Sequence, residues 1–152
     1  MEEPRWLTDD EQQAWRGLAA VLLKLPAALE HQLHRDAGIG HFDYFVLALL
    51  SEAPDRALRL SHLAEQSNAS LSRLSHVVTR LQKRGWVERQ PCPDDARATF
   101  AVLTDAGMDK VVETAPGHVA RVRSLVFDGL GPEGVEDLRR VCDALLEGVE
   151  DA

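Results

Sequence analysis

The feature that most constrains this chain of 152 residues is a pair of short helix-forming stretches followed by two strand-forming stretches. The first helix is predicted from about 62 to 66, with Ser61 as its N-cap. A tight turn then leads to Ser70, whose hydroxyl is suited to cap the next helix. Gly85 can end that helix in the left-handed conformation, which costs glycine little. The order predicts a helix-turn-helix whose second helix buries Leu71, Leu74, Val78 and Leu81.

A β-hairpin is predicted directly after this pair of helices. Residues 86–89 alternate apolar and charged side chains, and residues 99–103 are rich in strand formers. The segment 90–98 between them holds two prolines and two aspartates, so we expect a long loop there. Helix, turn, helix and hairpin in this order predict a winged helix-turn-helix. The fold class is therefore mainly α with a small β-hairpin wing.

Long helices are predicted on both sides of this lobe. The first begins with a capping box at Thr8 and Glu11, continues to about residue 38, and is expected to be interrupted or kinked at Pro26. A second helix is predicted from about 42 to 52. After the hairpin we expect a long helix with a distortion at Pro116-Gly117, and a last helix that begins at Pro132. The chain is thus read as one domain over 1–152, with a winged lobe over 42–104.

The distribution of charge supports a local contact with nucleic acid. The whole chain carries a formal charge of −8, which argues against a protein that coats nucleic acid with its entire surface. Residues 56–99 nevertheless hold eight basic and four acidic residues, whereas the remainder holds nine basic and 21 acidic ones. A basic middle between acidic ends is typical of a protein that binds DNA through one region.

Other partners and compartments are disfavoured. No apolar run approaches the roughly 18 residues that a membrane span needs, and the acidic N-terminus is followed by no apolar signal region. Two cysteines are too few for a disulfide scaffold, so we expect a reduced, cytoplasmic protein. The sequence has no phosphate-binding glycine loop, nucleophile elbow or zinc-protease motif, and neither an enzyme nor a bound cofactor is expected.

The helix that follows Ser70 can enter the major groove of DNA, which admits one α-helix. We expect base-edge contacts from its first two turns and phosphate contacts from its ends. A wing arginine is suited to a narrow minor groove. The candidate base-edge residues are Ser72, Arg73 and His76, the phosphate residues are Ser70, Thr79, Arg80 and Lys83, and the wing residue is Arg97.

The sequence resembles the MarR family of bacterial transcriptional regulators. Residues 95–98, Asp-Ala-Arg-Ala, are similar to the family's D-x-R-A wing pattern, and residues 103–107 to the L-T-x-x-G that follows it. Residues 81–89 resemble the L-x-x-x-G-hydrophobic-hydrophobic-x-R exit of the recognition helix. The resemblance covers about 60–107, and the flanking helices agree in number and order.

This resemblance implies a homodimer in which the terminal helices, 8–38 and 105–150, intertwine and two winged lobes bind a palindromic operator. Family members usually repress, and many release DNA when a phenolic or other aromatic effector binds between the lobes and the dimer domain. We expect Asp95 to stabilise the wing through an ion pair, for example with a basic residue of the recognition helix; a solvated loop pair of Asp95 and Arg97 is the alternative. The resemblance also suggests Trp15, Tyr44 and His118 as residues that line an effector pocket.

The residues themselves give independent support for a dimer. The predicted last helix carries an apolar stripe that has few partners in so small a domain, and a C₂ dimer would bury it. Such a dimer also places two recognition helices about one turn of DNA apart. Packing of the stripe within its own chain is the alternative.

Three other functions stay open at this stage. Cys92 lies between two prolines and is expected to be exposed, which leaves a redox response open. No cysteine lies near the start of the first helix, where peroxide-sensing members of the family carry theirs. Cys142 is expected to pack on the apolar stripe. His31 and His34 could share a helix face, with Asp36 and His41 nearby, but a zinc site needs three or four ligands and no metal site is predicted. A winged helix that binds protein is disfavoured because the outer face of 70–84 is polar and cationic.

Overall fold

The computed structural model describes residues 3–150 and begins with the long helix α1, Asp9–Ala37. The predicted capping box is present: the Thr8 hydroxyl accepts from the Glu11 amide at 3.2 Å, and the Glu11 carboxylate accepts from the Thr8 amide at 2.8 Å. The helix continues through Pro26, so the predicted interruption is wrong. Pro26 is exposed, and water can reach the carbonyl of Leu22 that the proline leaves without a partner.

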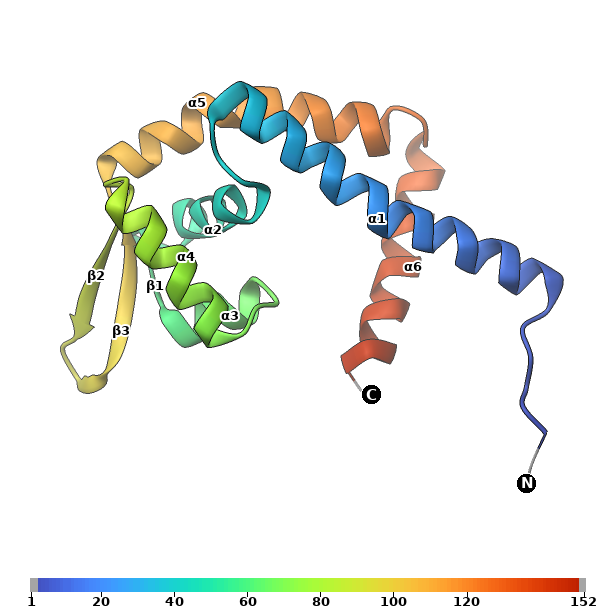
Figure 1. The fold of residues 1–152 in the computed structure, drawn as a ribbon, viewed down its shortest axis with the longest axis horizontal. Helices are drawn as coiled ribbons and strands as arrows, with labels where there is room; N and C mark the ends of the chain where they lie inside the picture. The colour runs from blue at the N-terminus through green and yellow to red at the C-terminus, as the bar shows by residue number, and fades with distance from the viewer. Residues whose placement is uncertain (1–2, 151–152) are drawn as a thin grey trace.

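The winged lobe follows in the predicted order (Figure 1). Its elements are α2 (His41–Glu52), η1 (Pro54–Arg56), β1 (Ala57–Arg59), α3 (Leu60–Gln66), α4 (Leu71–Lys83), β2 (Val87–Cys92) and β3 (Asp95–Leu103). The three strands form an antiparallel sheet in the order β1-β3-β2. Ser70 caps α4 by accepting from the Arg73 amide at 3.1 Å, and Gly85 ends it with a φ of 75°. The predicted cap of α3 is wrong, because Arg59 and not Ser61 holds that position.

The hairpin differs from the prediction in the length of its strands. β2 and β3 leave only Pro93-Asp94 as the turn between them, so the long loop predicted over 90–98 is wrong. Pro91 is tolerated because β2 is an edge strand, where a residue without an amide hydrogen need not break a ladder on both sides. The register shifts between Pro91 and Cys92, which is where the strand adapts to the prolines.

Two helices complete the chain. α5 spans Asp105–Val122 and continues unbroken past Pro116 and Gly117, where a distortion was predicted. The irregularity lies further along, in the five-residue π-helical segment η2 (Arg123–Phe127), and α6 (Pro132–Glu150) follows. In Figure 1, α5 lies beside the C-terminal part of α1, the N-terminal part of α1 extends away from the lobe, and α6 runs downward from the far end of α5, apart from the lobe. No helix within residues 3–150 is long and apolar enough to cross a membrane.

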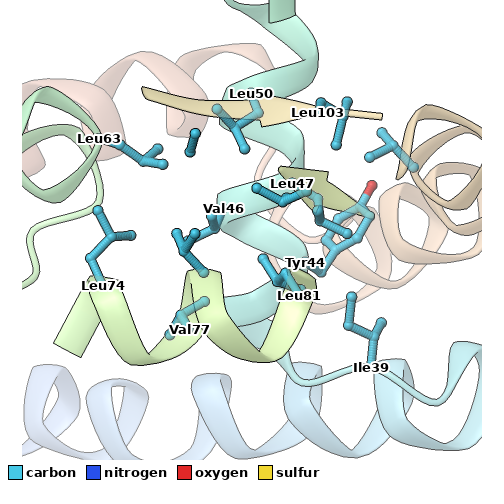
Figure 2. Packing of buried hydrophobic residues seen from close by; sticks show 14 of the residues in the cluster. Ile39, Tyr44, Val46, Leu47, Leu50, Leu63, Leu74, Val77, Leu81 and Leu103 are labelled. Atoms are coloured by element: carbon cyan, nitrogen blue, oxygen red, sulfur yellow. The ribbon is translucent and has the colours of Figure 1, made fainter. Parts of the chain in front are cut away.

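The hydrophobic core lies inside the winged lobe, where α2, α3, α4 and the sheet meet (Figure 2). Leu47, Leu50, Leu63 and Leu81 are fully buried there, and Leu33 joins them from α1. α4 contributes Leu74, Val77, Val78 and Leu81, whereas the predicted core residue Leu71 is 54% exposed. The lobe therefore has a core of its own, and this core fixes the outer face of α4.

Candidate nucleic-acid interface

The outer face of α4 is polar and cationic. Its core-facing residues recur at helical spacing, which leaves one continuous stripe for solvent. Every residue of the predicted interface that lies on α4 is exposed, namely Ser72, Arg73, His76, Thr79, Arg80 and Lys83. The structure thus places the predicted base-edge and phosphate residues on one accessible face. Arg73 lies at the N-terminal end of α4, where the free amides of the first turn also favour an anion.

A groove separates α4 from the wing. It is lined by residues from β1, α3, α4 and β3, among them Arg59, Ser61, Leu71, Ser75, Arg97 and Thr99. Arg97 is exposed, and its backbone amide donates to the Asp95 carboxylate at 3.0 Å. Within residues 3–150 Asp95 forms no ion pair, so the expected ion pair is replaced by a backbone hydrogen bond that shapes the turn.

Two arginines of α4 are held by residues of α2. The Arg73 guanidinium lies 4.2 Å from the centre of the Phe42 ring. Arg80 binds the Asp43 carboxylate through two donors of its guanidinium: its Nε donates to Oδ2 at 2.8 Å, and its Nη2 donates to Oδ1. This pairing raises the pKa of Arg80 above its ordinary value. Arg80, predicted as a phosphate ligand, therefore already has one anionic partner in the free chain.

Arg89 was missed as a site residue, although it was part of the sequence pattern that indicated the family. It lies on β2, and its guanidinium reaches across to α4. Its Nη2 donates to the Ser75 carbonyl at 2.9 Å and to the Thr79 hydroxyl at 3.0 Å, and its Nη1 donates to the Gln82 carboxamide at 2.9 Å. The wing strand β2 and helix α4 are thus joined by one side chain.

The L-T-x-x-G pattern has a direct structural reason. Thr104 caps α5 by accepting from the Gly107 amide at 3.0 Å, and its hydroxyl donates to the Gly85 carbonyl at 2.7 Å. Gly107 packs against the backbone of Trp86, where an added Cβ would collide with the Trp86 carbonyl oxygen and lie 2.6 Å from a methyl group of Leu103. The pattern fixes the end of α4, the start of the wing and the start of α5 in one place.

Two of the three predicted effector residues meet at the junction of α1, α2 and α5. The rings of Tyr44 and His118 lie edge to face at 4.9 Å, and His118 Nδ1 is 3.3 Å from the Gln32 carboxamide oxygen. Burial lowers the pKa of His118 below its ordinary value. Trp15 is not part of this junction: it is 56% exposed and lies about 20 Å along α1 from Leu29, the first buried residue of that helix.

The cysteines and the histidine pair lie in unexpected surroundings. Cys92 is 5% exposed and accepts a hydrogen bond from Arg59 at 3.5 Å, so the expectation that it is exposed is wrong. Cys142 is exposed on α6. His34 binds Glu30 at 2.8 Å. Over residues 3–150, no group of three or more histidine, cysteine, aspartate or glutamate side chains is arranged to hold a metal ion.

This fold and this face define a winged helix-turn-helix protein of the kind that regulates transcription. The chain is 47% identical to Sco3205 of Streptomyces coelicolor, a MarR family transcriptional regulator whose structure was solved in complex with DNA; the match has a TM-score of 0.93 and covers 95% of this chain and 91% of Sco3205. AbsC, a MarR family regulator of the same organism, is 39% identical with a TM-score of 0.93, over 98% of this chain and all of AbsC.

Residues 42–99 match the MarR family itself. The repressor YetL of Bacillus subtilis is 25% identical over 68% of this chain, and the match spans only 61% of YetL. The chain belongs to the MarR family of transcriptional regulators. The family resemblance and the winged fold read from the sequence are both confirmed.

Proposed function

We propose that the protein is a homodimeric transcriptional repressor that binds a palindromic DNA operator and is released from it by a small-molecule effector. The observation that carries the proposal is the exposed, polar and cationic face of α4 beside a wing that presents Arg97. The Sco3205 complex shows that a relative of this length and fold binds DNA. Such a function needs no catalytic step, and a chromosomal operator places the protein in the cytoplasm.

On DNA, α4 lies in the major groove and the wing follows the adjacent minor groove. Ser72, Arg73 and His76 then face base edges, where an arginine reads guanine with two hydrogen bonds. Ser70, Thr79, Arg80 and Lys83 meet phosphates on either side. Arg97 enters the minor groove, whose negative potential is strongest in narrow A·T-rich stretches.

The dimer is supported by apolar surface that one chain leaves open. On α6, Val141, Leu145 and Leu146 are each about half exposed, and on α1 Leu22 and Leu23 are 59% and 77% exposed. Apolar side chains in such number on two long helices favour burial by a second copy. The elements 8–38 and 105–150 are accordingly proposed as dimerisation helices around the winged lobe.

The effector is proposed to bind near the junction of α1, α2 and α5. Tyr44 and His118 offer an aromatic edge and an imidazole there, next to the helices that would form the dimer. A ligand in this place contacts the lobe and the dimerisation helices together, so it can favour one spacing of the two recognition helices over another. Trp15 can contribute to the same pocket only from the partner chain.

A selection from a library of random duplexes, at two salt concentrations, tests the proposal. We expect enrichment of a palindrome whose half-sites are about 10 base pairs apart, with retention that persists at the higher salt. Retention that vanishes at higher salt without any enriched sequence would mean phosphate contacts alone and would refute operator binding. A protein that retains no DNA at either salt would favour a protein-docking role for α4.

A further inference from the structure

Two arginines on α4 and a third, Arg84, directly after it are each met by the segment 38–43, which holds the connection from α1 and the first turn of α2. The arginines are seven and four residues apart, which places them on one side of the helix. The three pairs are Arg73 on the Phe42 ring, Arg80 on the Asp43 carboxylate and Arg84 on the Gly38 carbonyl at 3.1 Å. Consecutive residues of the first turn of α2 therefore hold the two α4 arginines that the sequence predicted for the interface.

The Asp43–Arg80 pair fixes the plane of the guanidinium. Two parallel N–H···O bonds are more directional than one, so they remove much of the rotational freedom of the long arginine side chain. The Asp43 side chain is 14% exposed, whereas that of Arg80 is 55% exposed. The carboxylate is thus the less exposed partner that holds the pair in place, and the guanidinium is the accessible one.

This arrangement leaves Arg80 able to bind DNA. A guanidinium has five N–H donors, and Asp43 accepts from only two donors of Arg80, one on Nε and one on Nη2. The Arg73 guanidinium lies over the Phe42 ring and donates no hydrogen bond within residues 3–150, so its N–H groups are also available. Both arginines are therefore oriented before DNA arrives, and both keep donors for it.

The first turn of α2 is itself firmly placed. The His41 backbone amide donates to the Glu30 carboxylate of α1 at 2.6 Å, and Tyr44 is 6% exposed. Phe42 packs against the core cluster of the lobe. A residue that orients an arginine must itself be held rigidly, because a mobile residue would allow the arginine side chain to move with it.

We propose that Asp43 and Phe42 are positioning residues that hold Arg80 and Arg73 in the geometry of the operator complex and so raise the preference for the operator over other DNA. The inference rests on the proposed function and concerns its specificity. Asp43 also offsets the charge of Arg80, which weakens attraction to phosphates of any sequence. Loss of Asp43 therefore weakens operator binding and leaves non-specific binding equal or stronger.

The test compares the operator with a scrambled duplex of equal length, for the wild-type protein and four variants. Asp43→Asn keeps the shape and removes the charge. Asp105→Asn is the matched control, because Asp105 is also an acid in the first turn of a helix and pairs with Arg56 at 3.1 Å, away from α4. Arg80→Met and the double variant Asp43→Asn/Arg80→Met complete a double-mutant cycle.

We expect Asp43→Asn to lower the ratio of operator to scrambled affinity on the order of tenfold, the size of one charge-assisted hydrogen bond, while Asp105→Asn leaves it within about twofold of wild type. In the Arg80→Met background the Asp43 substitution should have no further effect. An unchanged ratio in Asp43→Asn, or fully additive effects in the cycle, would overturn the inference. A wild-type protein that does not distinguish the two duplexes would instead overturn the proposed function.

Phe42→Leu keeps the inference testable if Asp43→Asn does not fold. This variant retains an apolar side chain against the core but removes the ring face under Arg73. Thermal unfolding first establishes that the variant is folded, and the same affinity ratio is then measured. A severalfold loss of the ratio supports positioning of Arg73, and a ratio equal to wild type contradicts it.

Discussion

The Nη2 of Arg89 on the wing strand β2 lies 3.0 Å from the hydroxyl of Thr79 on α4, the proposed recognition helix. The same hydroxyl donates to the Ser75 carbonyl at 2.9 Å, so wing, side chain and helix backbone form one chain of hydrogen bonds. The angle between the wing and α4 is therefore set by polar contacts of a single arginine as well as by the core below it.

Replacing Arg89 with methionine should loosen this connection. We expect operator affinity to fall about tenfold and the free energy of unfolding to fall by about 1–2 kcal/mol, because several hydrogen bonds from a charged donor are lost. Fluorescence anisotropy with operator DNA and chemical denaturation measure the two effects. Arg140→Met on exposed α6 is the control and should change neither. Equal affinity in Arg89→Met would mean that the core alone sets the wing angle.

Gly107→Ala should be strongly destabilising. The new methyl group would collide with the Trp86 carbonyl oxygen, and backbone cannot move aside as a flexible side chain can. We expect a loss of about 2–3 kcal/mol from overpacking and displaced backbone. Gly129→Ala, where nothing lies within 4 Å of the added atom, should change the free energy of unfolding by less than about 0.5 kcal/mol. Similar denaturation midpoints for the two variants would contradict this account.

The sequence predicted most reliably those features that depend on neighbouring residues. The caps at Thr8 and Ser70, the stop at Gly85 and the start at Pro132 are local hydrogen-bonding or backbone requirements, so a few letters suffice to reveal them. The wing and the recognition helix were predictable for the same reason, and the family patterns added their order.

Contacts between distant parts of the chain were not predictable in this way. Asp43 and Arg80 are 37 residues apart, and no local pattern connects them. The burial of Cys92 depends on how the strands of the sheet pair, which the local sequence does not show. The two neighbouring prolines instead led us to expect an exposed cysteine. The apolar stripe of α6 was visible in the sequence, and one chain alone leaves it exposed.

The stability of the protein should fall below about pH 6.5. Burial lowers the pKa of His118 and of His41 in the folded chain, so below their ordinary value the unfolded chain binds more protons. The stability that the two neutral histidines contribute is complete at a pH above their unfolded-state pKa. It is lost as the pH falls through their folded-state pKa. We expect the drop in Tm between about pH 7.5 and pH 5.5 to be smaller in His118→Gln. The exposed His62→Gln serves as control and should show the wild-type drop.

Leu145→Glu should separate the proposed dimer. Leu145 is 45% exposed in one chain and lies on the apolar stripe of α6. A carboxylate buried without a partner in an apolar interface is costly, so sedimentation should show monomers at concentrations where the wild type is dimeric. The winged lobe should keep its fold because its core lies elsewhere. A wild-type protein that sediments as a monomer would show that the stripe has another purpose.

Arg97→Ala should abolish most operator binding without affecting the fold. Arg97 is exposed at the wing, and only its backbone amide is used by the turn at Asp95, so the substitution removes a guanidinium and leaves the hairpin intact. If this guanidinium enters the minor groove, affinity should fall more than tenfold for an operator with A·T-rich flanks and less for one with G·C-rich flanks. The plot of log affinity against log salt should also become shallower by about one unit. An equal loss on both operators would assign Arg97 to a phosphate, and unchanged affinity would remove the wing from the interface.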